Sequence, residues 1–288
     1  CYHRQHHHGE FRRRWKTKPS RKNRSIVFKK IKMMKNILGV AIALCMSITA
    51  FGWGQTGHRA IGKIAENHLT KKAKQALKEI MGHESLAESS TWMDEVRSDN
   101  AYNFAKTWHY VTVPKGMDYH SAEHEEKGDA YEAIGRMKNI LKNVESTKIE
   151  KMEAIRMLAH LVGDIHQPLH VGTGEDRGGN NVKIKWFYED SNLHRIWDSG
   201  MIEEKKMSFS EIAELVDHPS DGISQEIASS TDLDVWVKEA VELRPQVYDI
   251  GDRDYLSYEY MYKNWSTVKT QLYKSGVRLA QILNNIYE

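Results

Sequence analysis

Cysteine is missing from the whole chain after residue 52. The protein has two cysteines, Cys1 and Cys45, and both precede that point. A disulfide framework and a zinc site built on thiolates are therefore excluded for residues 53–288. Any metal ion bound there has to be held by histidine, by carboxylates or by backbone groups.

Acidic residues are almost missing from residues 1–52, which contain 13 lysines and arginines but only one acid, Glu10. Residues 53–288 contain 29 basic and 38 acidic residues, so their net charge is −9 although the whole chain carries +3. The overall charge therefore gives no support for a general nucleic-acid-binding surface. Any contact with a polyanion has to be local, through bound metal and a few basic side chains.

Long hydrophobic runs are also missing. The apolar run Ile37–Met46 has ten residues, too few to span a membrane, which takes about 20. Lys35 precedes this run, and Ala50 and Gly52 supply small residues at the −3 and −1 positions of a cleavage site. This order is typical of a secretory signal peptide, here residues 34–52.

We therefore expect three parts. Residues 1–33 are an upstream basic segment outside the mature protein, residues 34–52 are the signal peptide, and residues 53–288 are a mature domain in the periplasm or outside the cell. Hydrophobic residues make up 40% of the chain and it has only 5 prolines, which is typical of a globular protein. Cleavage would free the α-amino group of Trp53, which could chelate a metal together with its own carbonyl oxygen. The alternative is that Trp53 is a buried aromatic anchor.

Two His-x-x-x-Asp pairs carry the chemistry. His160 and Asp164 are four residues apart, which on a helix places both side chains on one face. Pro168 ends or bends that helix, so His170 can turn back toward the same space. His194 and Asp198 repeat the spacing. A single such pair is most often a surface hydrogen-bonded pair, but two of them with a third histidine predict a cluster of zinc ions, because imidazole and carboxylate are ligands that zinc favours.

Helical periodicity dominates the rest of residues 53–288. Thr70 and Gly82 supply the start and stop signals of one helix. Short extended segments are predicted at 108–113 and 182–187. The fold class is therefore all-α, a single mainly helical domain with a short β-hairpin or two. The expected helices cover 58–69, 71–81, 129–144, 150–166, 208–217, 224–242 and 256–287.

Three further histidines are predicted not to bind metal. His166 lies two residues from Asp164 and points to a different face of its helix. His120 and His124 lie in a polar loop and are expected to be solvated. The Gly-rich segment 172–181 suits a tight loop near the site, but it is not a phosphate-binding P-loop because no Gly-Lys-Ser/Thr follows it.

Six separated motifs occur in a characteristic order between Trp53 and the Arg278-Leu-Ala tail. Together they resemble the zinc-dependent single-strand nuclease and 3′-nucleotidase family, the nucleases called S-one and P-one. The motifs are Trp53-Gly-x-x-Gly-His58, Trp92-x-Asp94-x-x-Arg97, Trp108-His109-Tyr110, His160-x-x-Gly-Asp164-x-x-Gln-Pro-Leu-His170, Gly178-Gly-Asn180 and Asn192-Leu-His194-x-x-Trp-Asp198.

The resemblance implies an all-helical fold shared with bacterial phospholipase C and three Zn²⁺ ions per chain. One ion is held by Asp94, His109, His160 and Asp164. A second is held by His170, His194 and Asp198. A third is held by the amine and carbonyl of Trp53, His58 and Asp164. Spacing alone indicates only five of these residues; His58, His109, Asp94 and Trp53 are added by the resemblance. Fungal and plant members use disulfides, which residues 53–288 cannot form.

The implied activity is hydrolysis of single-stranded DNA or RNA and of 3′-nucleotides, leaving 5′-phosphate products. Asp94, Arg97 and Asp164 are the implied catalytic residues, with Arg97 stabilising charge at the phosphate. The alternative for Arg97 is an exposed ion pair with Asp94. Tyr110 is placed to stack on a base, and the alternative is an ordinary core tyrosine. We expect a monomer without stable membrane association.

Two other functions fit parts of the pattern. A phospholipase C shares the zinc arrangement, but phospholipases resemble His-x-x-x-Glu at the last ligand, where this chain has His194 and Asp198. A secreted binding module would use zinc for structure alone and needs closed four-coordinate sites. Only three protein ligands are expected at His170, His194 and Asp198, which leaves an open position and favours catalysis.

Overall fold

Residues 53–288 belong to one compact unit of the chain. The computed structural model describes residues 53–219, 223 and 225–288. The predicted upstream segment and signal peptide lie outside the described residues, and their boundaries stay predictions.

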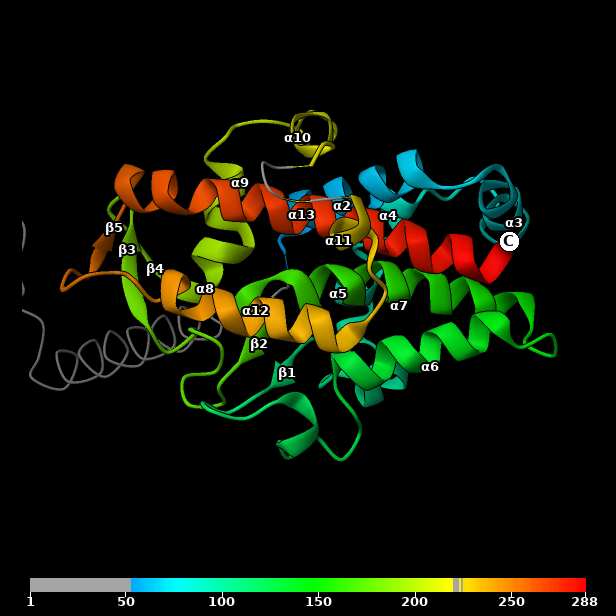
Figure 1. Ribbon diagram of the computed structural model, residues 1–288, viewed down its shortest axis with the longest axis horizontal. Coiled ribbons are helices and arrows are strands. Elements are labelled where there is room, and N and C mark those ends of the chain that lie inside the picture. Colours follow the sequence, from blue (N-terminus) through cyan, green and yellow to red (C-terminus); the bar gives the residue numbers. More distant parts are fainter. Residues whose placement is uncertain (1–52, 220–222, 224) are drawn as a thin grey trace, which may run out of the picture. The chain divides into compact units, whose positions relative to one another are not determined.

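Helices make up most of the described part, which confirms the mainly helical fold class. Helix α7 (Lys148–His166) packs against α6 (Ala130–Lys142), α12 (Leu233–Val247) and α13 (Tyr258–Tyr287), as Figure 1 shows. Helix α13 also packs along α2 (Gln55–His68). The remaining α-helices of the described residues are α3 (Lys71–Met81), α4 (Leu86–Ser89), α5 (Trp92–Glu95), α8 (Leu193–Arg195), α9 (Met201–Glu203), α10 (Phe209–Val216) and α11 (Gln225–Ser229).

The strands of the described part are short and form two small sheets. Strand β1 (Val111–Thr112) pairs in parallel with β2 (Val171–Gly172). Strand β3 (Lys183–Trp186) pairs with β4 (Glu189–Asn192) as an antiparallel hairpin and with β5 (Tyr255–Leu256) in parallel. The extended segment predicted at 108–113 is shorter than expected, because turns continue up to His109.

Capping residues fix several helix ends where the sequence predicts them. Thr70 accepts a hydrogen bond from the backbone N–H of Ala73, and Gly82 ends α3 at a φ of 70°. Helix α7 begins at Lys148, two residues before the predicted start. The reason is a reciprocal capping box between Thr147 and Glu150, which extends the first turn.

Two predicted helices differ from the structure. The helix expected at 224–242 is two helices, α11 and α12, because Asp232 caps a new start by accepting from the N–H of Asp234. The helix expected around His194 and Asp198 begins as α8 and continues as a π-helical turn, Ile196–Gly200. Such π turns are rare and occur frequently at functional sites.

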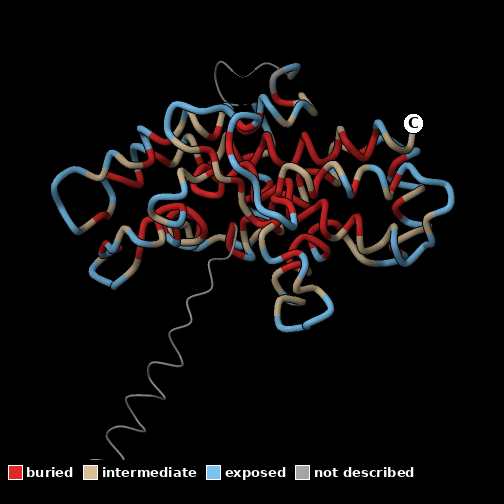
Figure 2. The backbone as a smooth tube through the Cα atoms, turned by 90° about the horizontal axis from the view of Figure 1, so that it is seen from below, coloured by how far each residue is buried: buried red, intermediate tan, exposed pale blue. Residues whose placement is uncertain are grey.

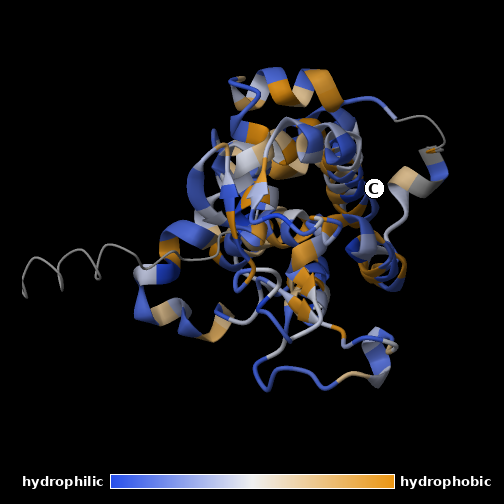
Figure 3. Ribbon diagram, turned by 90° about the vertical axis from the view of Figure 1, so that its left-hand side faces the viewer, coloured by the Kyte–Doolittle hydropathy of each residue, from blue (hydrophilic) through white to orange (hydrophobic). Residues whose placement is uncertain are grey.

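Two hydrophobic clusters form the interior, visible as buried segments in Figure 2. One contains side chains of α3, α6 and α7, and the other contains side chains of α2, α8 and β3. Hydrophobic residues gather on the helix sides that face one another, as Figure 3 shows. Helix α7 is buried without interruption from Met157 to its last residue, His166. Among the described helices, none is both long and apolar enough to cross a membrane.

Candidate metal centre

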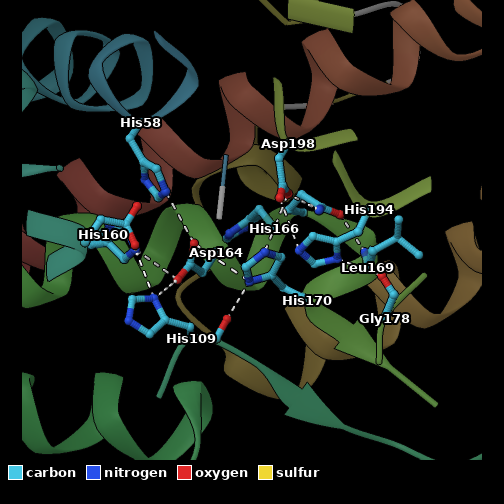
Figure 4. Close-up of polar contacts among 12 residues, drawn as sticks. His58, His109, His160, Asp164, His166, Leu169, His170, Gly178, His194 and Asp198 are labelled. Atoms are coloured by element: carbon cyan, nitrogen blue, oxygen red, sulfur yellow. Dashed lines mark hydrogen bonds and ion pairs between the residues drawn. The ribbon is translucent and has the colours of Figure 1, made fainter. Parts of the chain in front are cut away.

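The first predicted pair lies in the interior. His160 and Asp164 are both completely buried on α7, and His160 Nε2 is 3.2 Å from Asp164 Oδ2 (Figure 4). The alternative of a surface hydrogen-bonded pair is therefore wrong. Burying a carboxylate without nearby positive charge is unfavourable, so this environment has to supply positive charge.

Four histidines surround the Asp164 carboxylate. His58 Nε2 lies 3.3 Å from Oδ1 and His109 Nδ1 lies 3.0 Å from Oδ2. His160 is the third, and His170 Nδ1 lies 3.8 Å from Oδ1. They come from α2, from the turn before β1, from α7 and from the turn after Pro168. Segments distant in sequence thus converge on one carboxylate.

The second predicted pair closes a neighbouring group. His194 Nε2 lies 3.1 Å from Asp198 Oδ2, and His170 Nε2 lies 3.6 Å from Asp198 Oδ1. The rings of His170 and His194 stack at 4.8 Å. All three side chains are buried. Pro168 begins the 3₁₀ turn that carries His170, so the predicted turn back toward the site is present.

Backbone carbonyls fix the orientation of three of these rings. The Nδ1–H groups of His160, His170 and His194 donate to the carbonyl oxygens of Ser90 (2.7 Å), His109 (2.5 Å) and Gly178 (2.7 Å). The neutral ring then carries its lone pair on Nε2, which is the arrangement found in metal-binding histidines.

Several buried polar atoms of these side chains have no hydrogen-bond partner. They are both ring nitrogens of His58, Oδ1 of Asp164, and Nε2 of His170 and His194. Buried polar atoms without a partner are rare in proteins, and atoms that bind an ion are one ordinary case. The donor set, imidazole and carboxylate, fits a zinc-type cation.

Three groups of side chains each place their ligand atoms within 4.8 Å of one another. They are His58, His160 and Asp164; Asp94, His109 and His160; and His170, His194 and Asp198. The structure therefore brings together all eight side chains that the sequence and the resemblance indicated. Trp53 is fully buried, and the N–H of Gly54 donates to the carbonyl of Asp198 at 2.7 Å, so the start of the domain lies beside the third group.

The electrostatics of the centre favour bound positive charge. Burial by itself lowers the pKa of His160 and His170, but the Asp164 carboxylate outweighs it and raises both to about 9. Burial raises the pKa of Asp164, yet the charges of His160 and His170 hold it well below its ordinary value. Burial lowers the pKa of His58 and His109. The negative charge of the buried carboxylates thus favours positive charge at this centre.

Glycines allow the close approach of these elements. A Cβ on Gly163 would lie 2.8 Å from Nδ1 of His58, so only glycine lets that ring stack on His160 at 4.0 Å. A Cβ on Gly57 would lie 2.9 Å from the Cβ of Trp53. These contacts explain why Gly57 and Gly163 are glycines, which helical periodicity does not explain.

The two predicted substrate residues lie at the edge of the centre. Arg97 Nη1 is 3.4 Å from Asp94 Oδ1, and its side chain is 31% exposed. Tyr110 is half-buried and its hydroxyl donates to Glu125 at 2.9 Å, so it is not an ordinary core tyrosine. Burial and Glu125 raise its pKa to about 12, which keeps the phenol neutral.

The three histidines predicted not to bind metal lie outside the three groups. His166 Nδ1 donates to the carbonyl of Val162 at 2.7 Å, and its other nitrogen accepts from Arg278 at 2.9 Å. His120 pairs with Asp234 at 2.9 Å on an exposed surface. His124 is less solvated than expected, with a 28% exposed side chain 3.4 Å from the buried Asp129.

Sequence reasoning missed the residues that hold the ligands. Ser90 and Gly178 act through backbone carbonyls, which leave no signal in residue type. Gln167 is fully buried and donates to Asp198 at 2.5 Å. One indication of this role was present in the sequence, the position of Gln167 between Asp164 and His170 in the same motif.

Comparison with known proteins agrees with this geometry. The family model described as S1/P1 Nuclease matches residues 53–288. Endonuclease 2 of Arabidopsis thaliana is 30% identical over 82% of this chain and 91% of its own length. Nuclease S1 of Aspergillus oryzae is 29% identical over 88% of this chain and 98% of its own, and nuclease P1 of Penicillium citrinum is 27% identical over 52% and 58%. The chain therefore belongs to the S1/P1 nuclease family, enzymes that hydrolyse phosphodiester bonds.

Proposed function

We propose that residues 53–288 form a secreted or periplasmic enzyme that hydrolyses single-stranded DNA and RNA and 3′-nucleotides to 5′-phosphate products, with three zinc ions. The observation that carries this proposal is the convergence of three histidine–carboxylate groups, several of whose buried atoms lack hydrogen-bond partners. Family membership supports the reaction type.

The family resemblance assigns the residues that would hold each ion, and the three groups support this assignment. Asp94, His109, His160 and Asp164 would hold one ion, and His170, His194 and Asp198 a second. His58, Asp164 and the freed amine and carbonyl of Trp53 would hold the third. Bound zinc supplies a water whose pKa falls from ~15.7 toward ~7, together with charge stabilisation at the phosphate. Four histidines lie close to Asp164, which supports a role for this carboxylate in holding two ions.

Side chains at the edge would position the substrate. The Arg97 guanidinium would bind a phosphate oxygen, because its fork matches that group and adds charge stabilisation. The ring of Tyr110 would stack on a base, with its hydroxyl tied back to Glu125. A duplex hides the faces of its bases, so a site that needs a stacked base prefers single strands.

The test uses protein secreted from the full chain. Its N-terminus is sequenced, its metal content is measured, and it is assayed on single-stranded DNA, duplex DNA and phosphatidylcholine micelles. We expect Trp53 at the N-terminus, three zinc ions and cleavage of single strands, with activity lost on chelation and restored by zinc. Hydrolysis of the lipid without cleavage of nucleic acid would show a phospholipase instead.

A further inference from the structure

Gln167 is the residue of the His160–His170 motif that the proposed function leaves without a role. It follows the last turn of α7 and is completely buried. Neither the spacing nor the resemblance makes it a ligand. Both of its polar side-chain atoms are nevertheless engaged in short hydrogen bonds.

The two bonds fix the orientation of the amide. The side-chain oxygen Oε1 accepts from the backbone N–H of Leu169 at 2.6 Å, and Nε2 donates to Asp198 Oδ1 at 2.5 Å. A backbone N–H can only donate, so the oxygen has to face Leu169. The nitrogen of Gln167 therefore has to face Asp198, and the assignment does not depend on a choice between two flips.

Asp198 is the carboxylate of the group formed with His170 and His194. Its Oδ1 accepts the hydrogen bond from Gln167 and lies 3.6 Å from His170 Nε2, whereas Oδ2 lies closer to a ring nitrogen, 3.1 Å from His194 Nε2. The same Gln167 side chain caps the 3₁₀ turn Pro168–His170. One buried amide thus connects the turn that carries His170 to the carboxylate contributed by a segment 31 residues further along.

We infer that Gln167 is a positioning residue that occupies Oδ1 of Asp198, so that the carboxylate offers Oδ2 to the cation held with His170 and His194. The inference rests on the proposed function, because it needs that cation. An uncharged amide does this without repelling the ion. Ligation through one oxygen also keeps a coordination position free for substrate, as catalytic zinc sites require.

The variant Q167M keeps the length and burial of the side chain and removes both hydrogen bonds. The matched control is Q271M, because Gln271 is also buried (2% exposed) and donates to the carbonyl of His166 at 2.8 Å, outside the three groups. Each protein is loaded with Co²⁺ in place of Zn²⁺. The visible spectrum and the affinity for each ion, by chelator competition, are measured together with thermal stability.

We expect Q167M to bind one ion about 10–100-fold more weakly, as is typical for loss of a hydrogen-bond partner of a ligand, and to show a changed cobalt spectrum. Q271M should lose stability but keep the parent's spectrum and affinities. The variant Q167N retains an amide on a shorter side chain, which can make at most one of the two hydrogen bonds. The same measurements are made on Q167N, so that the test does not depend on the folding of Q167M.

The outcomes separate this inference from the proposed function. A parent protein that binds no metal would overturn both. If the parent binds metal and H194A loses one ion, while Q167M and Q167N keep the parent's spectrum and affinities, the proposed function stands and the role of Gln167 is overturned.

Discussion

At the scale of single residues, Asp164 shows why this carboxylate can be buried at all. Histidines from separate segments lie 3.0–3.8 Å from its oxygens, and their charge holds its pKa well below the ordinary value. In water the same carboxylate would be stabilised by solvent and would need no positive neighbours. Because Asp164 contacts histidines of more than one proposed zinc site, its loss should affect more than one ion.

We predict that D164N lowers nuclease activity by more than about 100-fold, because even loss of an outer partner of a metal ligand costs ~10–100-fold. Metal analysis should show the loss of more than one zinc ion. The control is D217N, since Asp217 is also a partly buried carboxylate paired with a histidine, His68 at 2.6 Å, but lies outside the three groups. Full zinc content in D164N would contradict a bridging role.

Tyr110 allows stacking to be tested apart from hydrogen bonding. Y110F keeps the ring and loses only the bond to Glu125, so KM on single-stranded DNA should change little. Y110A removes the ring and should weaken binding by the ~1–3 kcal/mol that one stacked base contributes, about 5–150-fold in KM. Steady-state kinetics measure both. Equal KM values for Y110A and Y110F would show that no base stacks there.

Trp53 carries a prediction that depends on processing. A variant whose leader cannot be removed keeps the Trp53 nitrogen in a peptide bond, where it is a poor metal ligand. We expect this variant to bind fewer zinc ions than the cleaved protein and to have little activity, as metal analysis and a nuclease assay would show. Full activity with the leader attached would contradict the predicted ligand.

At the scale of elements, the β3–β4 hairpin is closed by two residues that suit its turn poorly. Phe187 and Tyr188 have φ values of 48° and 76°, a pair of positive angles that two-residue hairpin loops usually give to Asn-Gly. Phe187 packs against a hydrophobic cluster, whereas Tyr188 is 80% exposed. The cost of the conformation at Tyr188 is therefore not balanced by burial.

We predict that Y188G stabilises the protein by about 1 kcal/mol, because glycine adopts a positive φ without the ~1–3 kcal/mol that other residues spend. Chemical denaturation measures the change, and Y188F serves as a control that keeps the strained backbone and should be neutral. Destabilisation by Y188G would mean that contact with the Tyr255 ring, 4.9 Å away, outweighs the strain.

At the scale of the whole described domain, one buried ion network joins three long helices. Glu239 of α12 accepts from Arg278 at 2.7 Å and pairs with Lys274 at 3.0 Å, both on α13. Arg278 also donates to His166 at the end of α7. The network therefore fixes the three helices against one another on the side of α7 that does not face the metal centre.

We predict that E239Q costs about 3–5 kcal/mol of unfolding free energy at pH 7, because it removes the negative charge that faces two buried cations. Burial raises the pKa of Glu239, but the bond from Arg278 outweighs it and the folded value lies below 4.5. The folded carboxylate thus stabilises above pH 4.5, and the difference between parent and variant should shrink as pH falls further. Urea titrations at several pH values measure it, with E242Q, an exposed i,i+4 partner of Lys238, as control.

Local sequence signals predicted local structure well where a single element was involved. The caps at Thr70 and Gly82, the buried His160 and Asp164 face and the turn at Pro168 are all short-range features. The break between α11 and α12 was missed, because the stripe of apolar residues outweighed the capping signal of Asp232. The π turn Ile196–Gly200 was missed because spacing alone cannot distinguish it from an α turn.

The sequence by itself determined which chemistry is available: imidazoles and carboxylates without thiolates, at spacings that put two pairs on helix faces. Only the tertiary structure decided that His58 and His109 meet Asp164, that Gly163 has to be glycine, and that Gln167 holds Asp198. The physical reason is that spacing along a helix depends on the backbone of that helix alone. Contacts between segments depend on how α2, α7 and the turns after them pack against one another. The periodicity of the sequence carries no information about that packing.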